Sequence, residues 1–95
     1  MAALWISHVS VTDEDEYAKY AKLAGPAIAK HGGTFIARGA RHVQIEGRDR
    51  PRNVVIRFDS VEAAQACYDS PEYQEALAFA KGSSERELMI VETTE

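Results

Sequence analysis

Three short segments of the sequence are apolar at every position, so the strands they predict have no face that suits water. These segments are Leu4–Ile6, Val54–Ile56 and Leu88–Val91. A strand with one solvated face alternates apolar and polar residues, and these segments do not. We therefore expect both faces of the sheet to be covered. The helical patterns suffice for one face, and we expect a second copy of the chain to cover the other.

Length and charge narrow the class of protein. The chain has 95 residues, which is enough for a single domain spanning residues 1–95. A chain this short buries a modest fraction of its surface, which again favours association into a homodimer. Its net charge of −4 argues against a nucleic-acid partner. It has neither an apolar run that could cross a bilayer nor a secretion signal, so we expect a cytoplasmic protein with no membrane partner.

The periodicity of the sequence predicts four strands and two helical regions. The expected strands cover residues 4–11, 34–38, 54–58 and 88–92. The helical regions follow the first and third strands, where apolar residues recur at spacings of three and four. Beyond the second strand, Gly39 suggests a bulge or bend, and apolar alternation resumes with Val43 and Ile45. The order is β-α-β-β-α-β, which is the split βαβ pattern of an α+β, ferredoxin-like fold.

Two prolines interrupt the helical regions. Gly25-Pro26 predicts a kink or two short helices in the first region, because proline lacks an N–H and clashes with the preceding turn. In the second region, Ser70 is suited to cap a new helix, with Pro71 at its first position and Glu72 near its positive end. The expected architecture is a four-stranded antiparallel sheet with these helices on one face.

Several motifs resemble a bacterial family, the domain of unknown function 1330 family. The resemblance runs nearly end to end, and its most specific part is the Tyr-Asp-Ser-Pro-Glu-Tyr block. The motifs are Trp5-Ile6-Ser7-His8-Val9, Lys30-His31-Gly32-Gly33, Ala37-Arg38-Gly39 and Tyr68-Asp69-Ser70-Pro71-Glu72-Tyr73. The resemblance implies a dimeric α/β barrel, in which two ferredoxin-like sheets pack face to face. Relatives in that superfamily include cofactor-free monooxygenases, haem-degrading enzymes, muconolactone isomerase and dye-decolourising peroxidases. The family itself has no established activity, so the resemblance assigns no catalytic residue.

Strand alternation sorts the polar side chains between the two faces of the sheet. Ile56 and Phe58 are expected to face the helices, so Arg57 points away from them. The same alternation places His8 and Arg38 on the face away from the helices, although a register error of one residue would reverse this. If the three converge, the arginines offer forked donors to a carboxylate, phosphate or enolate. His8 could then move a proton near neutral pH.

These residues also have a purely structural interpretation. The arginines could pair with Glu92 or other acids, and His8 could form only a hydrogen bond. Tyr20 and Tyr73 lie on helical apolar stripes, where they could be core residues or could line the mouth of a cleft. The candidate residues for small-molecule binding are His8, Arg38, Arg57, Tyr20 and Tyr73.

No motif indicates a metal or cofactor. The histidines are far apart and form no close-spaced metal pair, so no metal site is expected, although their spacing leaves haem undecided. Cys67 has no partner for an internal disulfide and lies on an apolar stripe. We expect a protein without a cofactor.

The sequence is compatible with three functions. The first is a small-molecule enzyme of the cofactor-free monooxygenase or isomerase type. The second is a non-catalytic dimer that binds a metabolite, and the third is a structural module. The expected ligand is a small anionic or enolisable organic molecule, bound between helices and sheet or between two sheets. The fold cannot choose among these functions, because function depends on the site.

Overall fold

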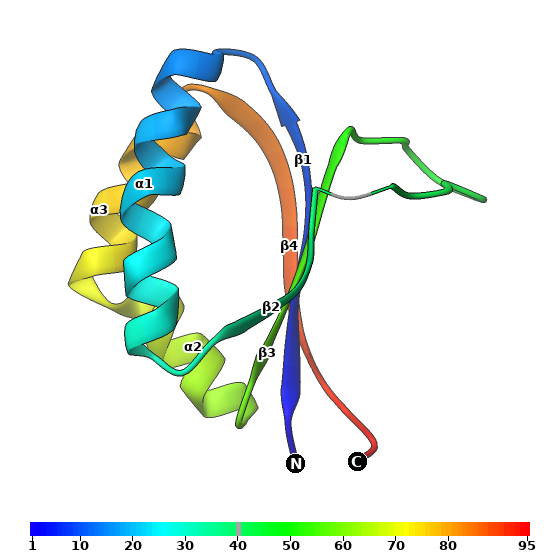
Figure 1. Cartoon of the computed structure of the whole chain (residues 1–95), viewed down its shortest axis with the longest axis vertical. Coiled ribbons are helices and arrows are strands. Elements are labelled where there is room, and N and C mark those ends of the chain that lie inside the picture. Colours follow the sequence, from blue (N-terminus) through cyan, green and yellow to red (C-terminus); the bar gives the residue numbers. More distant parts are fainter. Residues whose placement is uncertain (40) are drawn as a thin grey trace.

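The computed structural model describes residues 1–39 and 41–95 and confirms the predicted α+β class. Its elements are β1 (Ala3–Val11), α1 (Glu14–Lys30), β2 (Thr34–Arg38), β3 (Arg52–Phe58), α2 (Val61–Asp69), α3 (Pro71–Lys81) and β4 (Ser84–Glu92). The four strands form one antiparallel sheet in the order β2-β3-β1-β4, which is the ferredoxin-like arrangement. All helices lie on one face of the sheet, and the other face is open in the single chain (Figure 1).

The core fills the space between helices and sheet. Trp5 is almost completely buried, and its ring centroid lies 5.7 Å from that of Phe58 and 5.1 Å from that of Tyr73. Ile56 and Phe58 face the helices, as alternation predicted. Cys67 is fully buried among them, and burial raises the pKa of its thiol to about 11. The thiol is therefore protonated and unreactive at neutral pH.

The first helix runs unbroken past its proline. Asp13 caps α1, with its Oδ1 accepting a hydrogen bond from the Glu16 N–H at 3.2 Å. Pro26 lies inside the same helix, so of the expected kink or two short helices, the second alternative was wrong. Gly25 gives the physical reason, because it has no Cβ to clash with the ring of the following proline.

The junction between α2 and α3 confirms the predicted restart. Ser70 ends α2 and caps α3 with one hydroxyl, which donates to the Cys67 carbonyl at 2.7 Å and accepts from the Tyr73 N–H at 3.2 Å. Pro71 occupies the first turn of α3, where its missing N–H has no helical partner to lose. The side chain of Tyr73 is thereby fixed over the sheet.

We expect Ser70→Ala to lower the free energy of unfolding by about 1–2 kcal/mol, because it removes a helix cap and a buried hydrogen bond. Pro71→Ala is the control and should be nearly neutral. Urea denaturation of both variants measures the difference. A Ser70→Ala midpoint equal to that of wild type would show that the cap contributes nothing.

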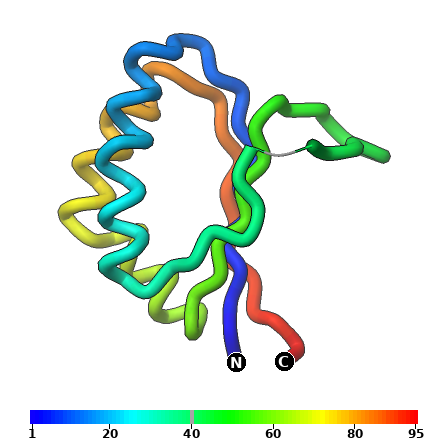
Figure 2. The backbone as a smooth tube through the Cα atoms, in the orientation of Figure 1, coloured from blue at the N-terminus to red at the C-terminus, as the bar shows by residue number. Residues whose placement is uncertain are grey.

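Two segments differ from the periodicity of the sequence. The last strand begins at Ser84, four residues before the expected start at Leu88. Val43 and Ile45 lie in no strand, and both are exposed in a loop that projects from the open side of the sheet (Figure 2). The two termini lie side by side, where the Thr93 N–H donates to the Ala2 carbonyl at 2.9 Å. Among the helices that the structure describes, none is long and apolar enough to cross a bilayer.

Candidate functional site

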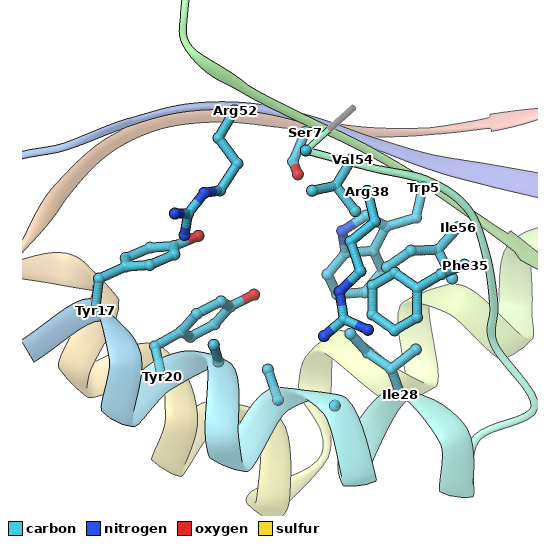
Figure 3. Close-up of a pocket in the computed structure, with 14 residues that line it drawn as sticks. Trp5, Ser7, Tyr17, Tyr20, Ile28, Phe35, Arg38, Arg52, Val54 and Ile56 are labelled. Carbon is cyan, nitrogen blue, oxygen red and sulfur yellow. The ribbon is translucent and has the colours of Figure 1, made fainter. Parts of the chain in front are cut away.

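A cavity of about 380 Å³ lies between α1 and the sheet. This volume is within the ordinary range for sites that bind small organic molecules. The cavity exists because the middle of its α1 wall is made by the small residues Ala21, Ala24 and Gly25. By contrast, α2 packs closely on β1, β3 and β4. The larger side chains point into the cavity from its two ends and from the sheet (Figure 3).

The lining of the cavity combines apolar walls with several hydrogen-bond donors. Its polar side chains are Trp5, Ser7, Tyr17, Tyr20, Arg38 and Arg52. The Ser7 hydroxyl and the Trp5 indole nitrogen face the cavity in Figure 3. None of the described lining residues is a histidine, aspartate or glutamate. The cavity is therefore rich in donors and poor in bases.

Strand register brings three arginines to the side of the sheet that faces the helices. Arg52 on β3 and Arg86 on β4 both pair with Val9 of β1, which places them in one row across the sheet. Arg38 on β2 pairs with Val54 in the neighbouring row. Three different strands thus deliver guanidinium groups to the helix-facing layer, with Arg52 and Arg86 in one row and Arg38 across the cavity from them (Figure 3).

Each of these arginines lies over an aromatic ring. The Cζ atom of Arg38 is 4.0 Å from the centroid of the Phe35 ring. The corresponding distances are 5.1 Å from Arg52 to Tyr17 and 4.7 Å from Arg86 to Tyr20. Such stacking holds the guanidinium plane in place and leaves its N–H edge available for hydrogen bonds.

Two tyrosines and Arg86 form a compact hydrogen-bonded group behind the cavity. The hydroxyl oxygens of Tyr20 and Tyr73 are 2.8 Å apart, although the residues are far apart in the sequence. One terminal nitrogen of Arg86 lies 3.0 Å from each hydroxyl and donates to both. Tyr20 lines the cavity, whereas Tyr73 is fully buried behind it. We call these three residues the Tyr20–Tyr73–Arg86 group.

Counting hydrogens assigns the direction of the bond between the tyrosines. Both oxygens accept from Arg86, so one hydroxyl must donate to the other. If Tyr20 donated, the hydrogen of the fully buried Tyr73 would lack an acceptor, which is costly. If Tyr73 donates, the Tyr20 hydrogen is free to point into the cavity. We assign the second arrangement, in which Tyr20 presents a donor to a ligand.

Burial determines the protonation of these tyrosines. It raises the pKa of Tyr20 far above its usual range, and this effect exceeds the opposing effect of the Arg86 charge. Burial likewise raises the pKa of Tyr17. Both hydroxyls are therefore protonated at neutral pH and act as donors, not as bases.

Few carboxylates balance these positive charges. Arg52 lies 3.9 Å from the exposed carboxylate of Glu14. Among the described residues, no acid forms an ion pair with Arg38 or Arg86. The Nε of Arg86 is buried without a hydrogen-bond partner. An uncompensated cation out of water is costly, so the half-buried Arg86 favours a negatively charged ligand beside Tyr20.

The structure corrects the predicted position of Arg38. Alternation placed it on the face away from the helices, but β2 contains a bulge between Phe35 and Ala37. The extra residue, Ile36, shifts the register by one position, so Arg38 turns toward the helices and lines the cavity. Of the bulge or bend expected at Gly39, the structure has a bend there, with a φ of 63°, and the bulge lies a few residues earlier.

His8 and Arg57 lie on the open face, as predicted, but they do not converge with Arg38. The Nδ1 of His8 is 2.6 Å from Asn53 Oδ1, and Arg57 forms an ion pair of 2.5 Å with Glu95, not with Glu92. Arg57 pairs with Leu4 across the sheet, so about 13 Å separates it from His8 along the strands. The expected cluster of one histidine and two arginines was therefore wrong.

Arg86 and Arg52 were not among the predicted site residues. Arg86 lies in the polar segment before Leu88, which was not expected to be a strand. Extending the alternation backward from Leu88 and Ile90 would have placed Arg86 on their face. No three metal-ligating side chains cluster anywhere in the described part of the chain.

Comparisons with known proteins agree with this fold. A family model described as "Domain of unknown function (DUF1330)" matches residues 2–94. Among curated proteins, no match to the chain was found. A similar solved structure is RPA0582 of Rhodopseudomonas palustris, a protein of unknown function. It is 17% identical, with a TM-score of 0.82 over 99% of this chain and 83% of that chain.

Two further structures are similar at lower TM-scores. SnoaB of Streptomyces nogalater, a cofactor-independent oxygenase, is 13% identical, with a TM-score of 0.67 over 99% of this chain and 94% of SnoaB. A dimeric protein of unknown function with a ferredoxin-like fold, from Bacteroides fragilis, is 16% identical. Its TM-score is 0.60 over 97% of this chain and 96% of that chain. Identities this low establish a common fold and nothing about chemistry.

Proposed function

This chain belongs to the DUF1330 family, a family of domains of unknown function, and we propose that it is a cofactor-free monooxygenase acting on a small enolisable aromatic molecule. The ligand binds in the cavity between α1 and the sheet as its enolate or phenolate. The observation that carries the proposal is the Tyr20–Tyr73–Arg86 group, which directs a hydroxyl donor, supported by an unpaired cation, into that cavity.

The proposed chemistry starts with stabilisation of the bound anion. The Tyr20 hydroxyl donates to the oxyanion, and Arg86 polarises that hydroxyl from behind. Positive charge from Arg86 and Arg52 favours the ionised ligand and lowers the pKa of its enol. A ligand that is acidic by itself, such as a phenol or an anthrone, then ionises without a base from the protein.

The lining of the cavity favours oxygenation over isomerisation. An isomerase moves a proton between two carbons and needs a side chain that accepts and returns it. No described lining residue is a histidine or carboxylate, and the tyrosines are protonated. An enolate can instead react with dioxygen at its carbon. A C–O bond forms, and the resulting peroxide takes up the proton released when the ligand ionised. The O–O bond and the remaining C–H bond of that carbon then break, so one oxygen remains as a carbonyl and the other takes the C–H proton and leaves as water.

The similarity to SnoaB in fold is compatible with this proposal. The alternative is a dimeric protein that binds the same anion without converting it. Both functions require the cavity and its donors, and they differ in whether dioxygen is consumed. A purely structural role gives no reason for Arg38 and Arg86, which pair with no acid among the described residues, to lie at a cavity of this size.

The test uses 1,8-dihydroxyanthrone, a fused-ring compound that ionises readily. Oxygen uptake, followed with an electrode, should exceed the rate in buffer, with one dioxygen consumed for each anthraquinone formed. Tyr20→Phe should lower the rate about 100-fold, as expected for loss of one oxyanion donor. The control is Tyr68→Phe, which alters a tyrosine of the same core that does not line the cavity.

The outcomes separate the two functions. Binding without accelerated oxygen uptake would reject the monooxygenase and support the binding protein. Equal rates for Tyr20→Phe and wild type would show that the hydroxyl plays no part. Failure of the anthrone and of simple naphthols to bind would reject the cavity as a site for enolisable aromatic molecules.

We also propose that the protein is a homodimer joined through the open face of the sheet. An apolar row crosses all four strands on that face, through Ala37, Val55, Ile6 and Met89. Leu4 and Val91 extend the row, and Met89 and Val91 are 59% and 43% exposed in the single chain. Exposed apolar side chains gathered on one face of a sheet are typical of an interface.

A further inference from the structure

Arg38 lies at the opposite side of the cavity from the hydroxyls of Tyr17 and Tyr20 (Figure 3). The space between them is bounded mainly by the apolar side chains of Ile28, Phe35, Val54 and Ile56 and by the ring of Trp5. A ligand that fills this space and accepts the Tyr20 hydrogen bond with its oxyanion therefore brings its far end to Arg38. The chemistry of Arg38 then indicates which group that end carries.

Three observations show that Arg38 is available to a ligand. The bulge at Ile36 turns its side chain into the cavity, whereas a regular strand would direct it to the open face. Its guanidinium stacks on the Phe35 ring at 4.0 Å, which fixes the plane and leaves the N–H edge unused. No acidic side chain among the described residues forms an ion pair with it.

We propose that Arg38 selects ligands carrying a carboxylate at the end of the ring system opposite the oxyanion. This inference rests on the proposed binding of an enolisable aromatic molecule in the cavity. A guanidinium edge matches the two oxygens of a carboxylate, and its stacked plane is preorganised for that contact. Phe35 and Ile28, which lie beside the Arg38 guanidinium in Figure 3, offer no further donors, which fits a planar monoanion better than a phosphate. The substrate class is therefore an aromatic hydroxy acid.

The test compares two fluorescent probes that differ only at this end. They are 6-hydroxy-2-naphthoic acid and its methyl ester, in which the hydroxyl and the acid group lie at opposite ends of the ring system. Wild-type protein should bind the acid at least tenfold more tightly than the ester, as expected for charge-assisted hydrogen bonds. Arg38→Gln should remove this preference: the affinity for the acid should fall about tenfold, and the affinity for the ester should change less than threefold.

The control variants separate Arg38 from other cations. Arg57→Gln removes an arginine that lies on the open face and pairs with Glu95, so it should leave both affinities unchanged. Arg38→Lys keeps the charge without the forked donors and should retain only part of the preference. Circular dichroism checks that each variant is folded; Arg38 is exposed at its strand end, so substitution is not expected to unfold the protein.

Each outcome bears on a separate claim. Equal binding of acid and ester by wild type would overturn the role of Arg38 and leave the oxyanion site intact, provided that Tyr20→Phe still weakens both probes. If Arg52→Gln lost the preference for the acid over the ester and Arg38→Gln kept it, the carboxylate would bind at Arg52. That result would also overturn the role of Arg38. Failure of wild type to bind either probe would reject this inference together with the proposed function.

Discussion

Replacing Arg86 with methionine is expected to weaken binding of anionic naphthols about 100-fold and to leave the protein at least as stable as wild type. Arg86 holds the hydroxyls of Tyr20 and Tyr73 at 3.0 Å each and has no carboxylate partner among the described residues. The loss corresponds to about 2–3 kcal/mol, the usual value for hydrogen bonds to a charged group in a site with little water.

The stability of the Arg86→Met variant distinguishes a functional cation from a structural one. A half-buried cation without an acid costs free energy through desolvation, and an apolar side chain of similar length removes that cost. The two tyrosine hydroxyls keep their mutual hydrogen bond of 2.8 Å in the variant. If Arg86 instead served the fold, the variant would be several kcal/mol less stable.

Fluorescence titration with 6-hydroxy-2-naphthoic acid and urea denaturation measure the two effects. Arg57→Met is the matched control, because Arg57 lies on the open face and forms an ion pair with Glu95. Arg86→Lys tests the donors apart from the charge and should recover only part of the affinity. If Arg86→Met bound the naphthoic acid with wild-type affinity, Arg86 would have no role in ligand binding, even if the variant were destabilised.

Introducing a charge at Val55 is expected to dissociate the proposed homodimer. Val55 lies at the centre of the open face, beside Ile6 on one strand and Ala37 on the other. In a two-fold symmetric interface the same patch meets its copy, so Val55→Glu buries two like charges. Burial of each carboxylate costs several kcal/mol, and the dimer dissociation constant should rise about 1,000-fold or more.

Analytical ultracentrifugation at tens of micromolar protein measures this change. Wild type should sediment as a dimer with an interface of about 1,600 Å² in total. Ala78→Glu is the matched control, since it adds the same charge at an exposed position of α3, on the opposite side of the molecule. A monomeric wild type, or a Val55→Glu variant that remains dimeric, would show that the open face is not the interface.

Local sequence determined most of the fold. Apolar periodicity predicted the order of strands and helices, and the assignment of Ile56 and Phe58 to the helix side was confirmed. Ser70 and Pro71 predicted the boundary between α2 and α3, because a helix cap depends on residues within one turn. These features were predictable since their causes lie a few residues apart in the chain.

The candidate site depended on interactions that local sequence does not contain. Of the residues predicted to bind a ligand, Tyr20 and Arg38 line the cavity and Tyr73 supports Tyr20 from behind. Arg38 reaches the cavity only because of the bulge at Ile36, which follows from pairing with β3 and reverses the expected alternation. His8 and Arg57 remain on the open face, outside this site.

Arg86 illustrates why tertiary structure was needed to recognise the site. The segment Ser84–Glu87 is entirely polar and has no apolar periodicity, so nothing local predicts a strand. It becomes part of β4 by pairing with β1, where Ser84 lies opposite Val11. That pairing turns Arg86 toward the helices, and only the packing of α1 against α3 brings Tyr20 and Tyr73 to it. The sequence determined the elements, whereas pairing between distant segments determined the cavity and its charge.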